Sequence, residues 1–122
     1  MAKRILVVDD EPHLLLLMKT ILERAGFVVE TAEDGKKSLA AVKAFRPDLV
    51  LLDMMMPGMS GREILEKLRQ DPKTKALKVI FITVARFSEV GQEVLKQLKA
   101  DGYITKPFDN DAMLKQVRKT LS

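Results

Sequence analysis

The sequence predicts an α/β fold in which a five-stranded parallel sheet carries helices on both faces. Three short apolar runs are rich in Val, Ile and Leu, namely Ile5–Val8, Leu49–Leu52 and Val79–Ile82. They are too short for helices and too continuous for strands with one hydrated face, so they indicate buried parallel strands. Amphipathic helical patterns separate them, and right-handed crossovers then place helices on both faces of the sheet.

Two further strands are predicted at the edges of this sheet. Val28–Ala32 and Tyr103–Thr105 mix polar and apolar residues, which is typical of strands with one free edge. The three most apolar runs then occupy the centre. The expected strand order is 2-1-3-4-5, the order of the flavodoxin-like doubly wound fold.

Five helices are predicted from periodic apolar positions and from their end signals. Pro12 suits a first helical residue, Gly26 suits a stop, Ser60 with Glu63 forms a capping box, and Asp109 is expected to cap the last helix. The expected helices span about residues 12–25, 35–45, 61–70, 88–98 and 110–121.

Length and composition limit the class of protein. A chain of 122 residues has the size of one domain, and it contains no cysteine, so disulfides and thiolate metal sites are excluded. The basic start is followed by a short apolar run that is neither a signal peptide nor a membrane span, so a cytoplasmic location without membrane contact is expected. The net charge of +4 raises nucleic acid as a partner. Because no recognition helix or basic arm accompanies it, direct nucleic-acid binding is not expected.

Polar side chains follow four of the predicted strands. Asp9 and Asp10 end the first strand, Asp53 ends the third, Thr83 ends the fourth and Lys106 follows the fifth. Ligands of open α/β sheets bind at the carboxyl ends of the strands, near the point where the strand order reverses. We therefore expect these five residues to form one site.

The chemistry of the five residues indicates phosphoryl transfer with a divalent cation. Three converging carboxylates repel one another unless a cation lies among them, and Mg²⁺ suits this oxygen set best, with Mn²⁺ as an alternative. Lys106 would neutralise phosphoryl oxygens and Thr83 would donate a hydrogen bond to one of them. Asp53 is the best candidate for a nucleophile that forms an aspartyl phosphate, which leaves Asp9 and Asp10 to hold the metal.

Four segments resemble the signature blocks of the receiver domain of bacterial two-component response regulators. They are "VVDDE", "LVLLDMMMPGMSG", "VIFIT" and "GYITKPF", in that order along the chain. The resemblance is to single-domain, chemotaxis-regulator-like receivers and covers essentially the whole chain, so one receiver domain over residues 1–122 without an output domain is expected. It implies these roles: Asp53 as phosphoacceptor, Asp9, Asp10 and the Met55 carbonyl as metal ligands, Lys106 as phosphate contact, Thr83 with Tyr103 as switch pair, and a cis Lys106–Pro107 bond.

The resemblance also implies partners and a function. The domain would accept a phosphoryl group from a phosphohistidine of a histidine kinase or phosphotransfer protein, depend on Mg²⁺ and hydrolyse its own phosphate, as a signalling switch rather than an enzyme. The expected docking surface consists of Leu14, Leu17, Pro107 and Phe108. Helix four, strand five and helix five would meet a downstream protein.

Two residues depart from the family pattern, and one alternative function remains open. Val84 follows Thr83 where a smaller residue is usual and is expected to narrow access to Asp53. Lys99 stands where glycine is common, so helix four is expected to end differently from the usual left-handed stop. The alternative is a receiver-like binding module that acts without phosphorylation. A haloacid-dehalogenase type phosphatase is disfavoured, because Met55 occupies the position of its second acid.

Overall fold

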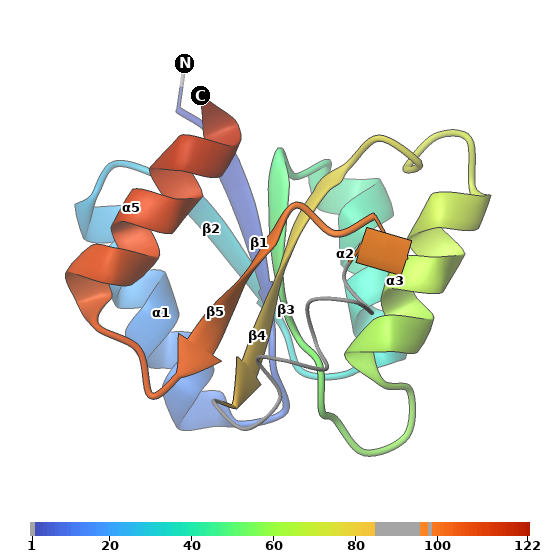
Figure 1. Cartoon of the computed structure of the whole chain (residues 1–122), viewed down its shortest axis with the longest axis horizontal. Helices are drawn as coiled ribbons and strands as arrows, with labels where there is room; N and C mark the ends of the chain where they lie inside the picture. The colour runs from blue at the N-terminus through green and yellow to red at the C-terminus, as the bar shows by residue number, and fades with distance from the viewer. Residues whose placement is uncertain (1, 85–95, 98) are drawn as a thin grey trace.

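The computed structural model describes residues 2–84, 96, 97 and 99–122, and its centre is a five-stranded parallel sheet (Figure 1). Strand β1 pairs with β2 and β3, and β4 pairs with β3 and β5, which gives the order β2-β1-β3-β4-β5. The predicted order is confirmed, with the two mixed-composition strands at the edges. The strands are β1 (Arg4–Val8), β2 (Val28–Ala32), β3 (Leu49–Asp53), β4 (Lys78–Val84) and β5 (Gly102–Lys106).

Helices cover both faces of the sheet, as the sequence predicted. In Figure 1, α1 and α5 lie on one side of the sheet and α2 and α3 on the other. Most of the helix expected at 88–98, namely residues 88–95 and 98, lies outside the described residues, while residues 96 and 97 are helical. The helices whose two ends lie within the described residues are α1 (Pro12–Arg24), α2 (Gly35–Phe45), α3 (Gly61–Gln70) and α5 (Asn110–Leu121). No helix in the described part of the chain has the length and apolar content needed to cross a bilayer.

The core consists of two apolar clusters, one on each face of the sheet. Successive side chains of a strand point to opposite faces, so Ile5 and Val7 pack toward α1 and α5 while Leu6 and Val8 pack toward α2 and α3. All four are fully buried, as are the matching residues of β3 and β4. This two-sided burial explains why the central strands are continuous apolar runs.

In the described part of the chain, side chains cap two helix starts: the predicted cap at Ser60 is confirmed, and Asp34 is a cap that the sequence reasoning did not name. The Asp34 carboxylate accepts the Lys37 N–H at 2.7 Å, and the Ser60 hydroxyl accepts the Glu63 N–H at 3.2 Å. Asp109 occupies the N-cap position of α5, but its side chain makes no capping hydrogen bond. The prediction that Asp109 caps the helix through its carboxylate was therefore wrong, because residue type alone does not fix the side-chain direction.

One prediction about a helix end is also corrected. Lys99 has φ 59°, so this lysine itself takes the left-handed conformation for which glycine is usual. Its carbonyl accepts a hydrogen bond from Arg69 Nη2 at 2.9 Å, a tertiary contact that helps to hold this conformation. Arg46, after α2, is the second non-glycine residue with positive φ among the described residues, at 52°.

Candidate functional site

Three carboxylates meet at the carboxyl-terminal edge of the sheet. Val8 of β1 pairs with Leu52 of β3, so Asp9 and Asp53 follow side by side. One carboxylate oxygen from each of Asp9, Asp10 and Asp53 lies within 4.8 Å of the others. Asp9 and Asp53 are only 1% and 4% exposed, whereas Asp10 is exposed. The predicted acidic cluster is therefore present, with two of its members out of contact with bulk water.

Lys106 reaches this cluster from the far edge of the sheet. Its Nζ donates a hydrogen bond to Asp9 Oδ2 at 3.0 Å and lies 3.7 Å from Asp53 Oδ2. The other Asp9 oxygen, Oδ1, accepts the Glu11 N–H at 3.0 Å. Asp53 and Lys106 point to the same face of the sheet as the α1 and α5 helices, because each lies an even number of residues from a strand residue packed there.

The electrostatics of the site favour a further cation. Burial raises the pKa of Asp53 to about 6, and the charges of Asp9 and Asp10 act in the same direction, while the Met55 N–H and Lys106 oppose them. Burial by itself would lower the pKa of Lys106, but the hydrogen bond to Asp9 and the charge of Asp53 raise it, so the ammonium is retained. Among the residues that the structure describes, one ammonium is paired with a cluster of three carboxylates and does not balance their charge. A hard divalent ion such as Mg²⁺ fits this all-oxygen donor set.

The Thr83 hydroxyl lacks a partner. The side chain is 5% exposed, and Oγ1 is buried without a hydrogen-bond partner in the described part of the protein. Leaving a buried hydroxyl unsatisfied costs about 1–3 kcal/mol, which a bound acceptor would recover. The Thr83 hydroxyl is therefore available to donate a hydrogen bond to a bound ligand.

The two residues of the predicted switch pair are diagonal neighbours on one face of the sheet. Phe81 pairs with Tyr103 and Thr83 pairs with Thr105, so Thr83 and Tyr103 project to the same side two residues apart in register. Tyr103 is half-buried and packs against the apolar cluster under α2 and α3. The Lys106–Pro107 bond is cis, as expected. The Val84 side chain, expected to narrow access to Asp53, lies outside the described residues.

Comparison with protein families decides what this arrangement belongs to. A family model described as the response regulator receiver domain matches residues 5–118. The chain belongs to this family. Receiver domains of response regulators act in two-component signalling, where histidine kinases phosphorylate them, and they are phosphoacceptor switches rather than classical enzymes.

Among the curated relatives of this receiver domain, some have about the length of this chain and others are about twice as long. The chain is 35% identical over 119 residues to the protein PilH of Pseudomonas aeruginosa, and the match covers 98% of both chains. It is 41% identical over 108 residues to the alkaline phosphatase synthesis transcriptional regulatory protein PhoP of Bacillus subtilis, covering 88% of this chain and 44% of that protein. It is 38% identical to the DNA-binding response regulator MtrA of Mycolicibacterium smegmatis, covering 99% and 51%. The chain thus spans about half the length of these two transcriptional relatives.

Solved structures agree with the family. The chemotaxis protein CheY4 of Vibrio cholerae superposes with a TM-score of 0.93 at 30% identity, covering 99% of this chain and 100% of that one. A CheY-like receiver domain protein of Methanospirillum hungatei gives a TM-score of 0.89 at 33% identity, covering 99% and 94%. The doubly wound fold of the receiver domain is therefore shared over nearly the whole chain.

Gly61 is a positioning residue that the sequence reasoning missed. It is the first residue of α3, and its N–H donates to the Met54 carbonyl at 3.2 Å. A Cβ at this position would lie 2.2 Å from the Asp53 carbonyl oxygen, a distance that no side chain tolerates. The absence of a side chain therefore lets the start of α3 press against the strand end that carries Asp53. The signal in the sequence was a glycine placed directly after the capping Ser60.

Two of the four predicted docking residues are exposed, and the other two are half-buried. Leu14 and Phe108 are half-buried at the margin of the apolar cluster under α1 and α5, Leu17 is 49% exposed, and Pro107 is exposed next to Phe108. Leu16, on the other side of α1, is 66% exposed. Leu17 and Pro107 therefore offer accessible apolar surface, while Leu14 and Phe108 pack partly against the core.

Proposed function

We propose that this receiver domain accepts a phosphoryl group on Asp53 from a phosphohistidine of a histidine kinase or histidine phosphotransfer protein. An Asp53 carboxylate oxygen attacks phosphorus, the P–N bond breaks, and its electron pair stays on the imidazole nitrogen. The product is an acyl phosphate. The observation that carries the proposal is the contact of Lys106 Nζ with both Asp9, at 3.0 Å, and Asp53, at 3.7 Å. The neighbouring strand β4 supports it, because the buried Thr83 hydroxyl near its end has no hydrogen-bond partner among the described residues.

Met55, Lys106 and Thr83 have different roles in orienting Asp53 and in balancing charge at the site. The Met55 N–H donates to Asp53 Oδ1 at 3.1 Å and so orients the carboxylate. Lys106 supplies a fixed positive charge where charge moves onto phosphoryl oxygens, and Thr83 donates its free O–H to one of them. Because Lys106 already contacts Asp9 and Asp53 before the reaction, its charge needs little reorganisation during it.

The metal site of the proposal consists of Asp9, Asp10, Asp53 and the Met55 carbonyl. These ligands would hold Mg²⁺, or Mn²⁺, through oxygen atoms alone. When bound, the ion neutralises negative charge shared by the carboxylates and the phosphoryl group. Without it, Lys106 is, among the described residues, the one cation paired with these carboxylates, which lie within 4.8 Å of one another.

The phosphorylated state is proposed to act as a reversible switch. The Thr83 hydroxyl moves to the phosphoryl group, and Tyr103, its diagonal neighbour, turns further inward, which changes the surface formed by β5 and α5. A downstream protein would read this surface together with helix four. The switch resets itself when water attacks phosphorus, the P–O bond to Asp53 breaks, and inorganic phosphate leaves.

The phosphoacceptor assignment is tested by intact-mass measurement after incubation with acetyl phosphate, with and without Mg²⁺. We expect a gain of one phosphoryl group that requires Mg²⁺ and is absent in Asp53→Asn. If Mg²⁺ binds but no phosphoryl group is gained, Val84→Ala separates the two explanations. Labelling restored by this change means that Val84 blocks the donor, whereas continued absence of labelling contradicts phosphorylation and favours a binding module.

The docking assignment needs a protein donor. Leu17→Ala and Phe108→Ala are expected to slow phosphotransfer from a phosphorylated histidine phosphotransfer protein roughly tenfold, as expected for loss of apolar interface contacts worth about 1.4 kcal/mol. Labelling by acetyl phosphate should stay unchanged, because the small donor needs no docking surface. Leu16→Ala is the matched control, since it removes a leucine of α1 that is more exposed than Leu17, 66% against 49%, and lies outside the proposed surface. Equal loss in Leu16→Ala would contradict the proposed surface.

A further inference from the structure

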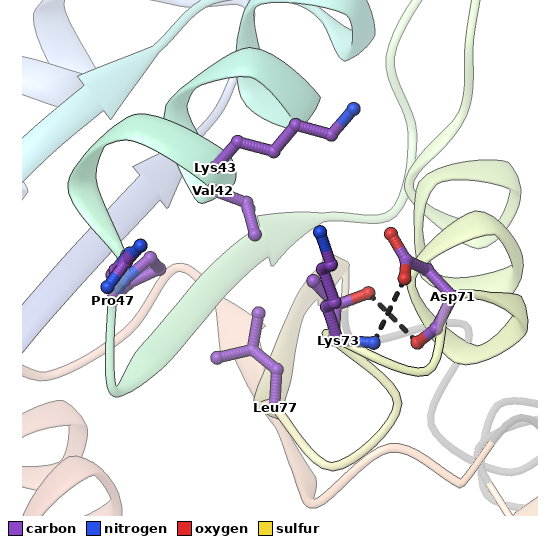
Figure 2. Close-up of a pocket in the computed structure, with 8 residues that line it drawn as sticks. Val42, Lys43, Pro47, Asp71, Lys73 and Leu77 are labelled. Carbon is purple, nitrogen blue, oxygen red and sulfur yellow. Dashed lines mark hydrogen bonds between the residues drawn. The ribbon is translucent and has the colours of Figure 1, made fainter.

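A second pocket lies at the amino-terminal edge of the sheet, opposite the acidic site. Its volume is about 760 Å³, which is within the range of small-molecule sites. It is formed by the end of α2, the turn into β3, and the connection from α3 to β4. Figure 2 shows Val42 and Leu77 pointing toward each other into this space, with Pro47 at one side and Lys73 at the other. None of its lining residues belongs to the phosphoacceptor site.

The lining combines an apolar floor with an excess of positive charge. Val42 and Pro47 are buried and Leu77 is half-buried, so the interior is apolar. Lys43 and Arg46, from the end of α2, and Lys73, from the connection between α3 and β4, line the pocket together with one acidic residue, Asp71. Within the described part of the chain, none of these three cations takes part in an ion pair. The pocket therefore carries two positive charges in excess.

Asp71 is already engaged by the backbone. Its Oδ1 accepts the Lys73 N–H at 2.9 Å, which Figure 2 draws as a dashed line. Its carbonyl accepts the Thr74 N–H at 3.0 Å. The Thr74 hydroxyl in turn donates to the Leu68 carbonyl at 2.6 Å. These bonds fix the wall of the pocket from within, so the side chains left to bind a ligand are the three cations.

The backbone conformation of Arg46 is a second observation that points to a function of its side chain. It ends α2 with φ 52°, a left-handed conformation that glycine adopts without the steric penalty of a Cβ. A strained residue that lines a pocket is a reason to look for a function of its side chain. The guanidinium also has the planar donor geometry that pairs with phosphate or carboxylate oxygens.

We propose that this pocket binds a small organic dianion, in which a phosphate ester or a pair of carboxylates contacts Arg46, Lys43 and Lys73 and an apolar body packs on Val42 and Leu77. The proposal does not depend on the phosphorylation of Asp53, because Asp53 ends β3 at the opposite edge of the sheet. The acidic site therefore stays accessible when the pocket is filled.

The proposal is tested by titrating the full chain, without Mg²⁺, with two probes and following its amide resonances by NMR. Phenyl phosphate and phthalate both carry a dianion on an aromatic ring, and the stronger binder identifies the oxyanion class. We expect shifts confined to residues 42–47 and 71–77, with affinity roughly tenfold above that of inorganic phosphate or benzyl alcohol, which lack the apolar body or the charge. No shifts in these segments with either probe, or shifts spread over the basic surface, would overturn the proposal.

Variants separate the pocket from general charge attraction. Arg46→Gly removes the guanidinium and relieves the left-handed strain, so the variant should fold at least as well while binding the preferred probe roughly tenfold more weakly. Lys43→Gln and Lys73→Gln are each expected to weaken binding in the same direction. Lys36→Gln is the control, because Lys36 is an exposed lysine of α2 that does not line the pocket. Unchanged binding in Arg46→Gly, or equal weakening in Lys36→Gln, would contradict the site.

Discussion

The two edges of the parallel sheet carry opposite charges in opposite surroundings. At the carboxyl-terminal edge, Asp9 and Asp53 are almost fully buried and share one ammonium, Lys106. At the amino-terminal edge, Lys43, Arg46 and Lys73 are exposed to solvent around a pocket. Burial of the acidic groups raises the free energy of their ionised forms, whereas the exposed basic groups stay hydrated and add little to the free energy of folding. Substitutions at the two edges should therefore affect stability very differently.

The largest expected effect comes from Gly61→Ala at the carboxyl-terminal edge. The new Cβ would lie 2.2 Å from the Asp53 carbonyl oxygen, so α3 or the end of β3 must shift. We expect a loss of about 3 kcal/mol in the free energy of unfolding, measured by urea denaturation, together with slower phosphorylation. Gly58→Ala is the control, because a Cβ there meets no atom within 4 Å and only the positive φ of 77° is strained. Equal losses in both variants would contradict the steric argument.

A matched pair of lysines compares the two edges directly. Lys106→Gln leaves the buried Asp9 carboxylate without its cation, so we expect a loss of about 2 kcal/mol in the free energy of unfolding at pH 7. Lys73→Gln removes an exposed charge with no ion pair among the described residues, and its effect should stay within about 0.5 kcal/mol. Similar effects of the two changes would show that the edges do not differ as proposed.

Asp53→Asn should stabilise the protein at neutral pH. Burial raises the pKa of Asp53 from 3.8 to about 6, so folding favours its protonated form. The ionised group costs stability, and the cost is absent below pH 4 and grows as the pH rises through about 6. We expect a gain of about 2 kcal/mol at pH 7 without Mg²⁺ that disappears below pH 4, measured by urea denaturation across pH. A gain that does not vary with pH would contradict this origin.

The smallest expected effect belongs to the left-handed residues. Arg46→Gly at the amino-terminal edge and Lys99→Gly shortly before β5 should each raise the free energy of unfolding by about 0.5 kcal/mol, because glycine adopts positive φ without Cβ strain. The gain is partly offset by the greater backbone entropy of glycine in the unfolded chain. Thermal unfolding of the two variants checks the prediction. A loss of stability in Lys99→Gly would show that tertiary contacts of the lysine side chain outweigh its strain.

Much of the fold could be predicted from the sequence because the pattern of burial is local in the chain. Short apolar runs identified the three central strands, and mixed composition identified the two edge strands. The site was predictable for a related reason. Parallel strands end at one edge, so Asp9, Asp53 and Lys106 could be placed together once the strands were known.

Other features depend on contacts that the sequence pattern does not contain. The need for glycine at position 61 follows from the close approach of α3 to the Asp53 carbonyl, which is a tertiary contact. Lys99 keeps a left-handed conformation that its residue type disfavours, and its carbonyl is held by Arg69 from another helix. Asp109 stands at the start of α5 without capping it. In each case a tertiary contact or a side-chain direction outweighs local propensity.

The sequence by itself determined the alternation of strands and helices, the strand order and the chemical identity of the acidic site, because hydrophobic periodicity and strand-end residues are properties of residue order. Only the tertiary structure decided how deeply Asp9 and Asp53 are buried, which contacts Lys106 makes, and that the buried Thr83 hydroxyl has no partner among the described residues. It alone revealed the basic pocket at the opposite edge. Burial, distance and cavity shape arise between segments far apart in the chain, and they set the pKa values and binding surfaces on which function depends.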